Sequence, residues 1–178
     1  MHSEARADRQ PGISRTIGRL AFGVDGSIAS TVYGTVVVMA TVTVGYAAEK
    51  HPWKLAVLVS TTAVVLWVAH LYAHSLSERI ALGHRLGRSE YASIAGREIG
   101  ILLAAAAPTL ALLLGAAGIF KETTAIWLVL VIGMVTLAAE GFRYARLERF
   151  GAMGTLTAIA GNLALGVFVV VLKALVAH

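Results

Sequence analysis

The sequence contains no cysteine and little charge, and both shortages restrict what the protein can be. Without cysteine, a disulfide framework, a thiolate metal cluster and a thiol nucleophile are excluded. Charged residues make up only 14% of the 178 residues, hydrophobic residues make up 57%, and the mean hydropathy is +0.76. A soluble globule needs more polar surface than this composition provides. The chain is therefore expected to be an integral membrane protein.

The apolar runs are continuous, and the alternation typical of outer-membrane barrel strands is absent. A transmembrane helix needs roughly 20 mostly apolar residues. Five stretches approach or exceed that length: 27–47, 55–76, 99–120, 124–141 and 153–175. Because polar or mixed residues precede the first stretch, it is expected to be a genuine span and not a signal peptide. We predict an all-α integral membrane fold, a single bundle of five transmembrane helices over residues 13–178, preceded by a disordered tail over residues 1–12.

Positive residues are distributed unevenly between the predicted connections. Eleven of the 15 lysines and arginines precede the first helix or fall between the second and third or the fourth and fifth. The positive-inside rule then places the N-terminus in the cytoplasm and, after five crossings, the C-terminus outside. The predicted location is the inner (plasma) membrane of a bacterial cell, which the chain crosses several times. Anionic lipid headgroups account for the net charge of +5, so nucleic acid is not an expected partner.

Two histidines interrupt the second apolar stretch, in the segment WVAHLYAHSLSER. Helical spacing places Trp67, His70, His74 and Glu78 in one stripe, within the cytoplasmic half of the bilayer. Ionisable groups in a membrane are costly unless they face a partner or water, so we expect a buried polar network at this depth. Its predicted members are Arg19, Asp25, Trp67, His70, His74, Glu98, Glu140 and Asn162.

Two interpretations of the histidines stand foremost. In the structural one, His70 hydrogen-bonds to Asp25 or Asn162 on another helix, and His74 reaches toward the membrane interface. In the other, the histidines line a proton or cation pathway, because imidazole changes charge near neutral pH and carboxylates attract cations. The residues alone leave both open.

Metal binding and enzymatic activity are the weaker alternatives. His70, His74 and Glu78 span about 12 Å of helix, so a single ion would need a further ligand such as Glu98 or Glu140. The motifs HExxH and GxSxG and a phosphate-cradling loop are absent. We predict no bound metal, no cofactor and no enzymatic activity, with a metal-dependent intramembrane enzyme as the remaining alternative.

Small residues recur along the start of the third apolar stretch. Gly96, Gly100 and Ala104 are four residues apart and share one helix face, which lets another helix approach closely. The partner is either a helix of the same chain or a second copy. Pro108, in the middle of the same stretch, is expected to kink the helix.

Two short stretches resemble a known channel family. RLAFGVDG, residues 19–26, is similar to the first-helix signature of the small bacterial and lysosomal potassium channels, an Arg followed after three residues by Phe-Ser-Asp. LWVAHLYAH is similar to the second helix of that family. The Phe-Ser pair is missing here, and the family repeat has six helices. The resemblance implies a homo-oligomer whose first helix lines the pore, with the first two helices joined by Arg19, Asp25, Trp67 and His70.

The sequence favours a cation or proton channel with a polar network in its cytoplasmic half. If the first helix lines a pore, Ile28, Thr31 and Thr35 are the residues expected to face it. The expected partners are the lipid bilayer, a monovalent cation or proton, and further copies of the chain. The alternative is a non-conducting membrane scaffold or partner subunit, in which the same polar residues only lock the helices together.

Overall fold

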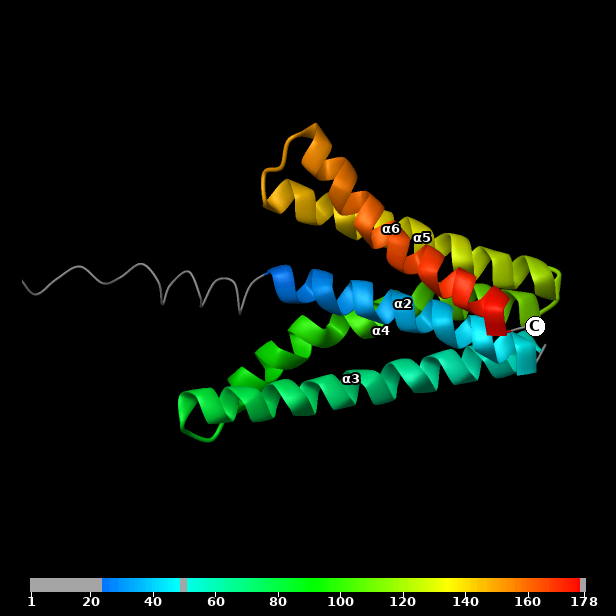
Figure 1. Ribbon diagram of the computed structural model, residues 1–178. Coiled ribbons are helices and arrows are strands. Elements are labelled where there is room, and N and C mark those ends of the chain that lie inside the picture. The colour runs from blue at the N-terminus through cyan, green and yellow to red at the C-terminus, as the bar shows by residue number, and fades with distance from the viewer. Residues whose placement is uncertain (1–23, 49–50, 177–178) are drawn as a thin grey trace, which may run out of the picture.

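The computed structural model describes the backbone of residues 24–48 and 51–176 and the side chains of residues 28–46 and 51–171. These residues form five α-helices and no strand (Figure 1). Each helix is long and apolar enough to cross a membrane, which confirms the predicted all-α fold with five candidate spans. The tail predicted over residues 1–12 lies outside the described residues. The helices are α2 (Val24–Ala48), α3 (Pro52–Leu82), α4 (Arg88–Ala116), α5 (Glu122–Leu147) and α6 (Ala152–Val176).

Every helix begins before the apolar run that predicted it, and all except α4 also end after it. With 31 residues, α3 is about 46 Å long, which exceeds the roughly 30 Å of a bilayer's hydrocarbon core. It ends at Leu82, and the next residue, Gly83, adopts a left-handed φ of 69° and donates its N–H to the Arg79 carbonyl oxygen. Gly87 then donates its N–H to the Glu90 carboxylate at the start of α4. The connection between α3 and α4 is therefore only residues 83–87.

The other hairpin turns are set by backbone geometry in the same way. α4 ends at Ala116, although the apolar sequence continues to residue 120, because Gly118 adopts a left-handed φ of 78°. After α5, Arg149 takes the same conformation, with a φ of 55°. In both turns the next N–H bonds back to a carbonyl five residues earlier. Each turn thus sends the chain back beside the helix it has just left.

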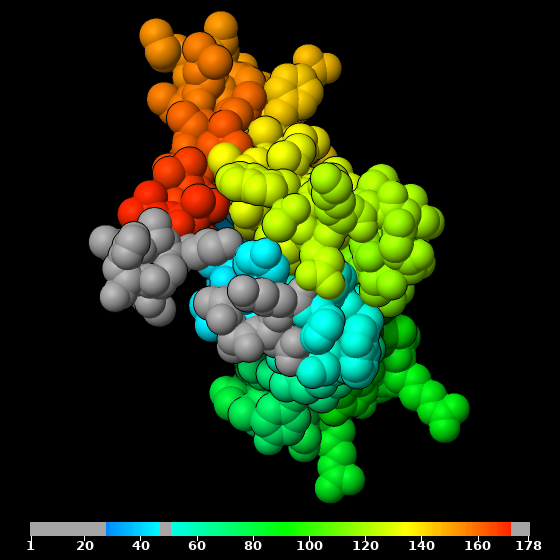
Figure 2. All heavy atoms as spheres, turned by 90° about the vertical axis from the view of Figure 1, so that its right-hand side faces the viewer, coloured from blue at the N-terminus to red at the C-terminus, as the bar shows by residue number. Residues whose placement is uncertain are grey.

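α2 is the central helix of the bundle. It contacts all four other helices, and half of its apolar span is buried, compared with 11% for α6. The hairpins α3–α4 and α5–α6 lie on either side of α2 (Figure 1). They spread apart at the end where α2 begins, called here the splayed end, and meet at the opposite, converging end. Seen from the converging end, α5–α6 lies above and α3–α4 below (Figure 2).

The splayed end carries most of the described positive charge. The connections at residues 83–87 and 148–151 both lie there, as does the first turn of α2 (Figure 1). Arginines stand in or beside these connections, including Arg85, Arg88, Arg146 and Arg149. Because consecutive helices run antiparallel, alternate connections return to the same end of the bundle, so the connections that carry the arginines lie together.

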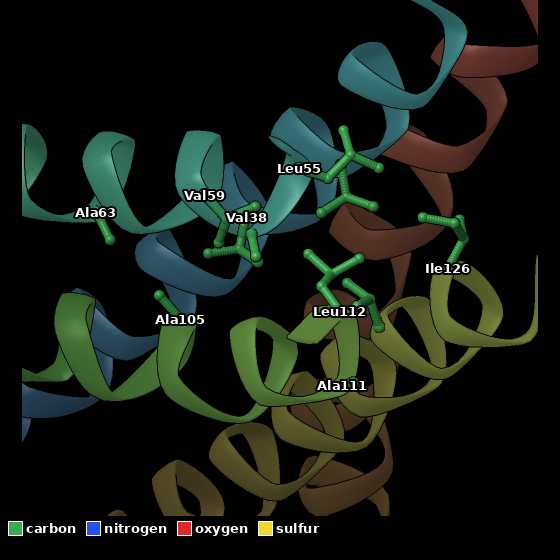
Figure 3. Close-up of a cluster of buried hydrophobic side chains, with 11 residues drawn as sticks. Val38, Leu55, Val59, Ala63, Ala105, Ala111, Leu112 and Ile126 are labelled. Carbon is green, nitrogen blue, oxygen red and sulfur yellow. The ribbon is translucent and has the colours of Figure 1, made fainter. Parts of the chain in front are cut away.

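The converging half is filled by an apolar cluster from α2, α3, α4 and α5 (Figure 3). Its buried members are valine, leucine, isoleucine and alanine only: Val38, Val42, Leu55, Ala56, Val59, Ala63, Ala105, Ala111, Leu112, Ile126 and Val129. Interiors of this kind pack as densely as organic crystals and hold no water. A cavity between the helices that holds water must therefore lie outside this apolar layer, nearer the splayed end.

Candidate functional site

The contact between His74 on α3 and Glu98 on α4 is the first feature of the site. The Nδ1 atom of His74 lies 2.7 Å from Oε1 of Glu98. The Glu98 side chain is only 5% exposed, whereas the His74 side chain is 52% exposed. The pair therefore connects a buried carboxylate to an imidazole that faces outward. Because both groups bind and release protons, a hydrogen bond between them can pass a proton in either direction.

The pair lies in the wall of a cavity of about 350 Å³ between α2, α3 and α4, called here the polar pocket. This volume holds roughly ten waters at about 30 Å³ each. On the α2 side, the Ser30 hydroxyl donates to the Arg97 carbonyl oxygen at 2.9 Å, which fixes α2 against α4. The pocket is lined by Ala29, Ser30, Tyr33, His70, His74, Arg97 and Glu98.

His70 connects the pocket to α2 through its ring. Its centroid lies 4.9 Å from that of Tyr33 and 6.2 Å from that of His74. Its Nδ1 lies 3.0 Å from the carbonyl oxygen of Leu66, one turn earlier in α3. A carbonyl can only accept, so Nδ1 carries the proton in this contact, and Nε2 of the neutral ring is left as an acceptor. The predicted partner Asp25 is in α2, but its side chain lies outside the described residues.

The remaining residues of the stripe bind α4. Glu78 forms an ion pair with Arg97, and the two side chains are only 17% and 13% exposed. Trp67 directs its indole N–H toward the Ala95 carbonyl oxygen, at 3.5 Å. The single face predicted for these residues is thus the face that packs on α4 and α2. Glu78, however, lies against an arginine and not against the histidines.

Two predicted members of the network lie on the other side of α2. Both carboxylate oxygens of Glu140 accept from Nη1 of Arg143, at 2.8 Å. Asn162 donates from Nδ2 to the Leu137 carbonyl oxygen at 3.1 Å. Asn162 also lines a second cavity, of about 280 Å³, between α2, α5 and α6. Ala29 lines both cavities, so a single turn of α2 separates them.

The residues predicted to face a pore are packed inside the single chain. Ile28 and Thr35 are buried, and the Thr35 hydroxyl donates to the Thr31 carbonyl oxygen at 2.8 Å. A Cβ built on Gly100 would lie 2.5 Å from the Thr31 hydroxyl, so this face of α2 lies directly against α4. Arg19, the remaining predicted residue, lies outside the described part of the chain.

The described side chains contain no group of three His, Asp or Glu residues that could hold a metal ion. Two of the carboxylates considered as metal ligands instead form ion pairs: Glu78 contacts Arg97, and Glu140 contacts Arg143. The arrangement is that of a histidine–carboxylate pair in the wall of a polar cavity.

The sequence interpretation missed Ser30, Tyr33 and Arg97 as residues of the site. Arg97 was counted only as one of the positive charges that set the orientation. Its place beside Glu98 at the start of a predicted helix was the available signal, because such a charge enters the membrane only with a partner. Nothing in the sequence distinguished Tyr33 from an interfacial tyrosine.

No protein-family model matches the chain, and no characterised protein or solved structure shows detectable similarity to it. The resemblance to the potassium channels stays a prediction, which in the described side chains rests on Trp67 and His70. Function therefore has to be inferred from the polar pocket.

Proposed function

We propose that this chain is a multi-pass protein of a bacterial plasma membrane that transfers protons, or conducts a small monovalent cation, through the polar pocket. The observation that carries the proposal is the 2.7 Å contact between the outward-facing His74 and the buried Glu98. A carboxylate in hydrogen-bonding contact with an imidazole can exchange a proton with it, and its negative charge attracts a cation.

The other charges of the pocket support this assignment. Arg97 also lines it, and an uncompensated guanidinium would repel a cation. Its pairing with Glu78 offsets that charge and leaves the carboxylate of Glu98 to act on the cavity. His70 adds an imidazole 6.2 Å from the His74 ring, a separation that one water can bridge.

From the polar pocket to the converging end, the pathway would require movement of α2 or further copies of the chain. In a single copy the apolar cluster fills the converging half. Because α2 separates two cavities and contacts every other helix, a shift of α2 would alter both cavities together. A homo-oligomer in which α2 borders a shared pore is the arrangement that the resemblance to the potassium channels suggests.

Proton flux tests the proposal. In liposomes that hold a pH-sensitive dye and a membrane potential, the wild-type protein is expected to carry protons, faster at pH 5 than at pH 8. Flux of a non-proton cation should instead be slower at pH 5 than at pH 8, because a protonated imidazole adds positive charge to the path. Glu98→Gln keeps the shape of the side chain and His74→Gln keeps a hydrogen-bonding group, but neither amide exchanges protons in this pH range, so each should lower proton flux at least tenfold.

His84→Gln is the matched control for these substitutions. His84 is exposed in the 83–87 connection and contacts only the adjacent Arg85 carbonyl oxygen among the described residues, so its replacement should leave flux unchanged. A wild-type protein that moves no ions contradicts the pathway. So does a pH response that neither Glu98→Gln nor His74→Gln alters.

We also propose that the splayed end faces the cytoplasm. The absence of cysteine allows single-cysteine labelling without background. In intact cells, a membrane-impermeant maleimide should label His51→Cys at the converging end but not Arg85→Cys at the splayed end. Arg85→Cys should become reactive only after the membrane is permeabilised. The reverse pattern would place the polar pocket on the outside and contradict the positive-inside assignment.

A non-conducting scaffold is the second candidate, and a specific observation favours it. Trp67, His74 and Glu78 all contact α4, so every one of these groups already has a structural partner. In such a scaffold, His74→Gln and Glu98→Gln would change stability without changing ion flux. The flux assay therefore separates the two candidates.

A further inference from the structure

A groove on the α3–α4 hairpin lies apart from the polar pocket and shares no lining residue with it. Its volume is about 260 Å³, and its apolar part comes from Leu71 and Leu76 of α3. Polar groups complete it, one hydroxyl from α3, one guanidinium and two phenols. This hairpin groove is lined by Leu71, Tyr72, Ser75, Leu76, Arg79 and Tyr91.

Ser75 is the observation that points to a ligand. The residue is only 4% exposed, and its Oγ has no hydrogen-bond partner among the described residues. A helical serine commonly bonds to the carbonyl one turn earlier, and this one does not. A buried hydroxyl without a partner is costly, so a bound group that reaches it would gain a hydrogen bond that the protein does not make internally.

Arg79 gives the groove its charge. The residue is exposed, and no described acidic side chain lies within ion-pair distance of it. Tyr72 and Tyr91 are also exposed and supply hydroxyl groups. A guanidinium with neighbouring hydroxyls is a donor set suited to a phosphate group. The two leucines would not contact a free phosphate, but they would contact a hydrocarbon chain.

The position of the groove along α3 agrees with this chemistry. Counted from the middle of the helix, Ser75 and Arg79 lie about 12 and 18 Å toward the splayed end. The hydrocarbon core of a bilayer ends about 15 Å from its centre. With the middle of α3 at the centre of the bilayer, the Ser75 hydroxyl would lie near the hydrocarbon boundary and the Arg79 guanidinium in the headgroup layer, where the phosphates of the lipids are found.

We propose that the hairpin groove binds one anionic phospholipid. Arg79 and the tyrosines would hold the phosphate, the Ser75 hydroxyl would donate to a glycerol ester oxygen, and Leu71 and Leu76 would contact an acyl chain. The site is independent of proton transfer, since it uses none of the residues of the polar pocket. Bound lipid would also join α3 to α4, because Tyr91 comes from the second helix of the hairpin.

Native mass spectrometry of the full chain in detergent tests the proposal, with phosphatidylglycerol and phosphatidylcholine as the added lipids. The wild-type protein should bind phosphatidylglycerol at least fivefold more tightly than phosphatidylcholine. Arg79→Gln should weaken phosphatidylglycerol binding at least fivefold. Arg85→Gln removes the same charge from the adjoining connection, outside the groove, and should change binding less than twofold.

Ser75→Ala separates a ligand-binding hydroxyl from a structural one. It should weaken phosphatidylglycerol binding two- to fivefold, yet leave the thermal midpoint of the lipid-free protein unchanged or higher. Three results would overturn the proposal. They are equal losses in Arg79→Gln and Arg85→Gln, equal binding of the two lipids, or full competition by glycerophosphoglycerol, which has the headgroup but no acyl chain.

Discussion

Gly100→Ala is expected to lower the free energy of unfolding by about 3 kcal/mol, because a single methyl group there meets the facing helix. A Cβ at this position would lie 2.5 Å from the hydroxyls of Ser30 and Thr31 and 2.9 Å from the Thr31 backbone nitrogen. Side chains can rotate away, but a backbone atom moves only if α2 and α4 separate. That separation would also break the hydrogen bond from Ser30 to the Arg97 carbonyl oxygen.

Gly96→Ala is the matched control, one turn earlier on the same predicted stripe. A Cβ at Gly96 would meet no described atom within 4 Å, so alanine should be tolerated there. It should even stabilise the helix, by up to about 1 kcal/mol, because glycine is a poor helix former. Unfolding in a detergent series, followed by tryptophan fluorescence, measures both variants. Equal stability of the two would contradict the close contact of α2 with α4.

Arg97→Gln should cost about 3–5 kcal/mol of unfolding free energy, the range found when one partner of a buried ion pair is removed. The Glu78 side chain is 17% exposed and would be left as a charge without its guanidinium partner. The same detergent unfolding series gives the value. The exposed Arg88, whose replacement by glutamine should change stability by less than about 0.5 kcal/mol, is the control.

The double variant Glu78→Gln, Arg97→Gln should recover much of the lost stability. Two amides of similar size can bond to each other across the same interface without a buried charge. The coupling energy from the double-mutant cycle is then a direct measure of the pair. A double variant that is less stable than Arg97→Gln alone would mean that Glu78 is held by groups other than Arg97.

Hydropathy predicted the five helices of the described residues because a bilayer leaves the backbone almost no alternative. Every N–H and carbonyl in hydrocarbon needs an internal partner, and a continuous apolar run meets this requirement only as a helix. Helix ends follow different rules. Ile119 and Phe120 are apolar, yet they lie outside α4 because Gly118 turns the backbone. Hydropathy carries no information about that turn.

The site was predicted less completely, because the depth of a residue in the membrane does not by itself determine which neighbours its side chain contacts. Glu98 was assigned to the histidines from its depth, and it contacts His74. Glu140 and Asn162 were assigned by the same reasoning, yet they lie on the α5–α6 side of α2. The rotation of each helix about its axis decides such cases, and that rotation depends on packing details such as the contact at Gly100.

The division of the bundle into a polar pocket and a dry apolar cluster determines where an electric field would act. Voltage falls mainly across the part of a protein that excludes water and ions, which here is the apolar cluster between the levels of Ala63 and Ile126 (Figure 3). A charge that reaches Glu98 through a water-filled pocket has done little electrical work. The total electrical work is roughly 2.3 kcal/mol per elementary charge per 100 mV. Nearly all of it would be done as the charge passes the valines and leucines of the apolar cluster. Any rearrangement that wets this layer would therefore be sensitive to membrane potential, whereas movement of an ion from the adjoining compartment into the polar pocket would depend on that potential only weakly.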